Sequence, residues 1–151
     1  MSAKTEKARD LFLEGYNCAQ SVVGAFCEDV GLDFETAIKL SSSFGGGMGR
    51  LREVCGAISG AFMIAGLKFG YLSPIDNKPK AEHYKLIQNM AAKFREENGS
   101  IICRELIGKE GTLMSHIPSE RTEEFYKTRP CTLLVERAAA IVEEMLDGKL
   151  N

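Results

Sequence analysis

Cysteines are the residues of this 151-residue chain that are best suited to chemistry. The chain contains five of them, at Cys18, Cys27, Cys55, Cys103 and Cys131. Their spacing fits no zinc-finger, ferredoxin or thioredoxin pattern, so they can act together only if the fold brings them together. If they stay apart, each is a small buried hydrophobe, which is how most free cysteines behave.

Composition predicts a globular protein without a nucleic-acid partner. Its 151 residues, 44% hydrophobic and 26% charged, can bury a sizeable core without disulfides, so we expect one domain over residues 1–151. The 19 lysines and arginines are balanced by 21 acidic residues, giving a net charge of −2. No broad cationic surface is then available to neutralise phosphates.

The N-terminal sequence is polar, and no apolar run approaches the ~18 residues that a membrane span needs. We therefore expect a cytoplasmic protein that does not insert into membranes. Because that compartment keeps most thiols reduced, five cysteines favour redox chemistry or metal binding over a secreted disulfide framework.

Apolar residues recur at helical spacing along the whole chain, and no segment alternates as a strand does. We expect an all-α, bundle-like domain. The helices are predicted over residues 3–14, 18–30, 34–43, 51–68, 80–97, 100–107 and 119–126, with a last helix from about residue 130. The 51–68 segment is apolar almost all round, which predicts a central buried helix.

Four of the five cysteines are predicted near helix N-termini. Cys18 follows the capping residue Asn17, Cys103 follows the candidate cap Ser100, Cys131 follows Pro130, and Cys55 lies in the opening turns of the central helix. A helix N-terminus carries partial positive charge and free N–H groups, which stabilise a thiolate. We therefore expect Cys18, Cys55, Cys103 and Cys131 to gather in one pocket.

The glycine-rich segment 45–49, Gly-Gly-Gly-Met-Gly, precedes Arg50 and the central helix. This run lacks the Lys-Ser/Thr ending of a phosphate loop and follows a helix, so it favours a turn that lets the backbone approach the region of Cys55. Arg50 would then adjust the pKa of a nearby thiolate. The two histidines, His83 and His116, lie far in sequence from the cysteines and are not assigned as ligands.

Residues 15–21, 44–50 and 54–60, with the later Cys103 and Cys131, resemble the redox-active protein family named for its C, CGAxxG, C, C pattern, C_GCAxxG_C_C. The CGAxxG motif is matched by Cys55, Gly56, Ala57 and Gly60. The resemblance implies a redox role, a link to transporter loci, and related domains that are associated with iron–sulfur centres. It selects Cys18, Cys55, Cys103 and Cys131 as the site and leaves Cys27 outside.

Three hypotheses follow from the sequence. In the first, Cys18 attacks an oxidised substrate and Cys55 resolves the mixed disulfide, which requires an external redox partner and no cofactor. In the second, all four site cysteines hold zinc or an iron–sulfur cluster in a non-enzymatic module. The third is a helical interaction protein whose thiols are structural.

Overall fold

The computed structural model describes residues 1–108 and 114–150, and within these ranges the regular structure is helical, with no β-strand. The predicted all-α fold is confirmed. The elements are α1 (Ala3–Glu14), α2 (Cys18–Phe26), the 3₁₀ helix η1 (Cys27–Val30), α3 (Phe34–Ser41), the 3₁₀ helix η2 (Ser42–Phe44), α4 (Gly56–Phe69), α5 (Asn77–Asn98), α6 (Cys103–Leu106), α7 (Glu123–Thr128) and α8 (Cys131–Leu146).

Side-chain caps determine where several helices begin. Asn17 caps α2 in a capping box with Gln20, and Asp33 caps α3 by accepting a hydrogen bond from the amide of Thr36. Gly15 ends α1 in the left-handed conformation that a C-terminal glycine adopts readily. The helix ends at residues 14, 18 and 34 therefore fall where the sequence predicts them, because a cap depends only on neighbouring residues.

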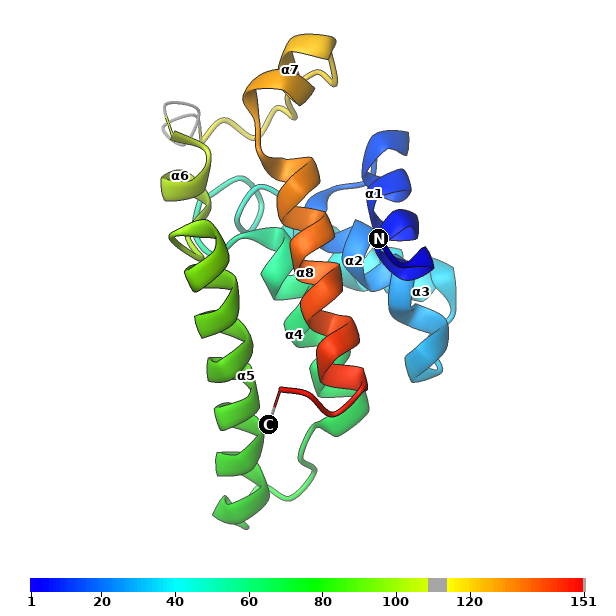
Figure 1. Ribbon diagram of the computed structural model, residues 1–151, viewed down its shortest axis with the longest axis vertical. Coiled ribbons are helices and arrows are strands. Elements are labelled where there is room, and N and C mark those ends of the chain that lie inside the picture. The colour runs from blue at the N-terminus through cyan, green and yellow to red at the C-terminus, as the bar shows by residue number, and fades with distance from the viewer. Residues whose placement is uncertain (109–113, 151) are drawn as a thin grey trace.

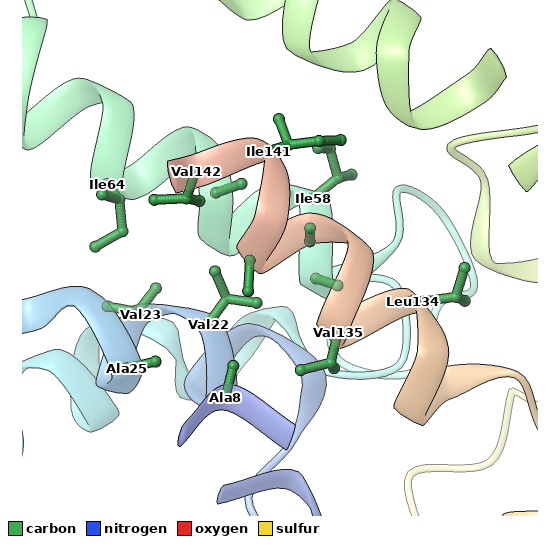
Figure 2. Close-up of a cluster of buried hydrophobic side chains, with 14 of the residues drawn as sticks. Ala8, Val22, Val23, Ala25, Ile58, Ile64, Leu134, Val135, Ile141 and Val142 are labelled. Carbon is green, nitrogen blue, oxygen red and sulfur yellow. The ribbon is translucent and has the colours of Figure 1, made fainter. Parts of the chain in front are cut away.

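Helices α1, α2, α4 and α8 enclose the core. In Figure 1, α4 lies behind α8, and α5 runs antiparallel to α8 along one side of the molecule. Figure 2 shows the side chains that these helices contribute, among them Ala8 of α1, Val22 of α2, Ile58 of α4 and Val135 of α8. All four are fully buried. The core thus ties together the helices that carry Cys18, Cys55 and Cys131.

The central helix begins later than its apolar pattern predicts. α4 is buried between α2 and α8, as expected, but it spans Gly56–Phe69 and not 51–68. Arg50 and Arg52 have positive φ, at 65° and 62°, which excludes them from a right-handed helix. Val54 forms an isolated antiparallel bridge with Ile102. This pairing with a distant segment keeps residues 51–55 outside the helix.

Other boundaries also differ from the predictions. The 18–30 helix ends at Phe26 and continues as η1, and the helix predicted over 100–107 is reduced to Cys103–Leu106. The 119–126 segment is helical only from Glu123, because Thr122 caps α7. Helix ends are decided by caps and tertiary contacts more than by periodicity.

Among the described residues, none of the helices combines the length and the apolar character that crossing a membrane requires.

Two glycines of α4 offer a matched test of its packing on α2. A Cβ on Gly60 would lie 2.9 Å from the carbonyl oxygen of Ala19, whereas a Cβ on Gly66 meets nothing within 4 Å. Gly60→Ala should therefore lower the free energy of unfolding by about 1–3 kcal/mol. Gly66→Ala should raise it by about 0.4–1 kcal/mol, because alanine restricts the unfolded chain. Urea unfolding followed by circular dichroism measures both. Equal stability of the two variants would show that the α2–α4 contact is not this close.

Candidate thiol site

A cavity of about 290 Å³ brings four of the five cysteines together. Its lining includes Cys18, Cys55, Cys103 and Cys131, and it does not include Cys27. The sulfur of Cys27 instead donates a hydrogen bond to the carbonyl of Gly24, at 3.3 Å. The grouping that the sequence predicts is therefore present in space, although the roles of its members stay a matter of proposal.

Each of the four cysteines stands at a helix N-terminus. Cys18 is the first residue of α2, after the capping box in which the amide of Gln20 donates to Asn17 Oδ1 at 2.8 Å. Cys131 is the first residue of α8, after Pro130. Both positions agree with the sequence analysis. A helix N-terminus carries partial positive charge, which favours a thiolate at these positions.

Cys103 and Cys55 differ from the prediction in detail. Cys103 begins α6, but its N-cap is Ile102 and not Ser100, whose hydroxyl accepts from the amide of Ile102 at 2.9 Å. Cys55 is the N-cap of α4 and not a residue of its opening turns. Its amide donates to the carbonyl of Ile101 at 2.8 Å, so backbone pairing holds the Cys55 and Cys103 segments together.

Glycines let the backbone approach the sulfurs closely. A Cβ on Gly47, whose φ is 68°, would lie 2.6 Å from the Cβ of Cys103. A Cβ on Gly56 would lie 2.7 Å from the carbonyl oxygen of Phe44 and 3.3 Å from the Cβ of Cys18. Only glycine fits both positions without a backbone shift. The glycine-rich segment therefore serves the close approach that the sequence analysis expects.

The cavity wall is rich in arginine. Four arginines line it: Arg50, Arg52, Arg121 and Arg129. Among the described residues, no aspartate or glutamate lines it. Arg52 is only 2% exposed, and its Nη1 donates to the sulfur of Cys103 at 3.7 Å. His116 also belongs to the lining.

Arg121 reaches the cavity from a distant part of the chain. It donates to the carbonyl oxygens of Phe12 at 2.6 Å and Tyr16 at 2.9 Å, and its guanidinium lies 4.1 Å from the centre of the Phe12 ring. These contacts fix a cation beside the start of α2. Stacking on an aromatic face holds a guanidinium without cancelling its charge.

Sequence reasoning found only part of this arginine cluster. It singled out Arg50, whose Nε donates to the carbonyl of Ser115 at 2.7 Å. The arginine that donates a hydrogen bond to the sulfur of Cys103 is Arg52. Arg129 lies two residues before Cys131, and this proximity was a signal that could have identified it. Arg121 has no such signal, because only the path of the folded chain brings it to the cavity.

Cys131 is the thiol most easily ionised. A hydrogen bond from the Cys18 thiol is the largest cause and, against the effect of burial, lowers the pKa of Cys131 to about 7. The guanidinium groups of Arg129, Arg121 and Arg52 act in the same direction. The same hydrogen bond, followed by burial, raises the pKa of Cys18 well above the usual range of a thiol.

The other two thiols stay protonated near neutral pH. Burial raises the pKa of Cys55 to about 12, although the amides of Ala57 and Ile58 oppose the rise. Burial also raises the pKa of Cys103, and the hydrogen bond from Arg52 opposes it. The sequence predicts the low pKa at Cys18, whereas the hydrogen bond between the two thiols lowers the pKa of Cys131 and raises that of Cys18.

The four cysteines do not form a metal-ligand set in this arrangement. Within residues 1–108 and 114–150, no three Cys, His, Asp or Glu side chains are placed to hold a metal ion together. Three of the sulfurs are already engaged, since Arg52 donates to Cys103 and Cys18 donates to Cys131. The residues present do not fit a zinc ion or an iron–sulfur cluster held by four thiolates.

The geometry agrees with what comparisons with known proteins found. No curated protein and no solved structure matched the chain. The family model described as "Putative redox-active protein (C_GCAxxG_C_C)" matches residues 16–145. In this chain the motif segment reads Cys-Gly-Ala-Ile-Ser-Gly at residues 55–60, and the match includes all four cavity cysteines. Because it spans most of the sequence, the chain belongs to this family of redox-active proteins.

Proposed function

We propose that this protein is a thiol–disulfide oxidoreductase in which Cys131 attacks a disulfide substrate and Cys18 resolves the intermediate. The observation that carries the proposal is the placement of Cys18 and Cys131 in one cavity lined by arginines, where interaction with Cys18 lowers the pKa of Cys131. A thiolate and a thiol in contact are the two groups that a dithiol exchange needs.

The first step forms a mixed disulfide. The Cys131 thiolate attacks one sulfur of the substrate, the substrate S–S bond breaks, and the other half leaves as a thiolate that takes a proton from solvent. An attacking thiol is most effective when its pKa lies near the ambient pH, and the pKa of Cys131, about 7, meets this condition.

The second step resolves this intermediate. Cys18 loses its proton to solvent and attacks the sulfur of Cys131, and the remaining half of the substrate leaves as a thiol. The substrate has gained two electrons and two protons, and the protein holds a Cys18–Cys131 disulfide. A cellular dithiol then reduces this disulfide by the same exchange. The cytoplasm, where the sequence predicts the protein to be, contains such reductants.

Cys55 and Cys103 have different roles in this proposal. Burial keeps both as thiols at neutral pH. Neither forms the hydrogen bond that lowers the pKa of Cys131, because Cys18 does so. The sequence hypothesis of Cys55 as the resolving thiol is therefore replaced by Cys18. Cys103, held by Arg52, keeps a guanidinium close to the thiolate.

Alkylation tests which thiol is ionised. Labelling of Cys131 by iodoacetamide should follow a titration with its midpoint near pH 7, since only the thiolate reacts. Cys18→Ala removes the hydrogen-bond donor and should move the midpoint upward, whereas Cys18→Ser retains a donor and should move it less. Peptide mass spectrometry across a pH series measures each cysteine separately. An unchanged midpoint in Cys18→Ala would contradict the role of this hydrogen bond.

Trapping tests the order of attack. With hydroxyethyl disulfide, Cys18→Ser should accumulate a mixed disulfide on Cys131, because the resolving thiol is missing. Cys131→Ser should form none, and Cys27→Ser should form the Cys18–Cys131 disulfide as the unmodified protein does. Intact-protein mass spectrometry distinguishes these products. Adduct formation on Cys18 in the Cys131→Ser protein at the unmodified rate would reverse the assignment, and loss of oxidation in Cys27→Ser would extend the site.

A further inference from the structure

The cavity gathers arginine side chains around the attacking thiol. Four arginines line it, and among the described residues Cys131 is the one cavity thiol whose pKa is lowered. The chain as a whole has a net charge of −2, so this concentration of cations is local to the cavity. A cavity lined with charge of one sign attracts ligands of the opposite sign.

Arg121 shows how this charge is kept available. Its hydrogen-bond partners are the carbonyl oxygens of Phe12 and Tyr16 and the hydroxyl of Tyr126, all uncharged. No carboxylate of the described residues forms an ion pair with it. Its positive charge is therefore oriented by the fold and remains able to act on a ligand. Planar guanidinium groups match the geometry of a carboxylate.

The remaining lining restricts the size and character of the ligand. The cavity volume is about 290 Å³, which suits a small molecule. Phe12, Phe125 and Leu134 supply apolar wall beside the cysteines and arginines. A molecule with a short apolar middle and anionic ends would contact both kinds of surface.

We infer that the substrate is a small disulfide whose arms end in carboxylates, with the arginines binding the carboxylates while the disulfide meets Cys131. This inference rests on the proposed thiol–disulfide exchange. The reaction is the same two-electron reduction: the S–S bond of the substrate breaks, two carboxylate-bearing thiols leave, and the protein gains the Cys18–Cys131 disulfide.

A series of three disulfides of similar size tests the charge preference. The reduced protein is mixed with dithiodipropionate, hydroxyethyl disulfide or cystamine, which carry anionic, neutral and cationic ends. The rate at which each disulfide oxidises the protein is divided by the rate at which it oxidises dithiothreitol, which corrects for the intrinsic reactivity of the disulfide. The protein should favour dithiodipropionate over the neutral compound by about tenfold relative to dithiothreitol, and cystamine should be slowest. Added salt should reduce the preference. Equal relative rates for all three would overturn the inference and leave the exchange function intact.

Suberate separates binding from redox chemistry. It is a dicarboxylate with the length of dithiodipropionate, but methylene groups replace its two sulfurs. Calorimetry should detect suberate binding to the reduced protein and no binding of octanediol. If suberate binds but none of the three disulfides oxidises the protein, the proposed exchange is wrong while the carboxylate site stands. If suberate does not bind, the carboxylate site is wrong.

Two arginine variants supply the matched comparison. Arg121→Gln should lower the preference for dithiodipropionate over hydroxyethyl disulfide by about tenfold, because a charged hydrogen-bond donor is lost. Taking the ratio of the two substrates cancels any change in the reactivity of Cys131. Arg137→Gln is the control, since Arg137 also donates to a backbone carbonyl, that of Glu97, but lies outside the cavity lining. If Arg121→Gln does not fold, Arg50→Gln should show the same loss. A preserved ratio in a folded variant of either lining arginine would contradict the inference.

Discussion

The close contact between the start of α4 and the start of α2 is the constraint on which the thiol site depends. Gly56 and Gly60 allow the two helices to approach until a Cβ at either position would meet the backbone of another segment. This approach places Cys55 beside Cys18, and the packing of α8 across both helices adds Cys131. A larger residue at Gly56 or Gly60 would therefore push the helices apart and separate the cysteines that they carry.

The four sulfurs of the cavity differ in how strongly the fold stabilises their thiolate forms. Several thiolates together would repel one another, and burial disfavours each of them. The fold concentrates its stabilisation on Cys131 through a hydrogen bond from Cys18 and nearby guanidinium groups. Cys55 and Cys103 stay protonated. In the proposed mechanism, these unequal pKa values distinguish the attacking thiol from its three neighbours.

The arginines connect reactivity with substrate choice. A thiolate by itself repels an anion, so an anionic substrate approaches it only when the surrounding charge is positive. Arg121 and Arg129 lower the pKa of Cys131 and also line the cavity that a ligand would enter. The same cations would therefore ionise the nucleophile and receive the substrate. On the proposed function, this double use gives a reason for a chain with a net negative charge to place four arginines around one cavity.

The sequence by itself determined the helical class, the cap Asn17, the helix start at residue 34, and the placement of Cys18 and Cys131 at helix starts, because these features depend on residues within one or two turns. Only the tertiary structure decided that α4 begins at Gly56, since the pairing of Val54 with Ile102 joins segments far apart in the chain. It also decided that Cys131 and not Cys18 has the low pKa, and that Arg121 belongs to the cavity. The physical reason is that caps and periodicity act through local backbone geometry, whereas charges and hydrogen bonds act through space between residues that only folding brings together.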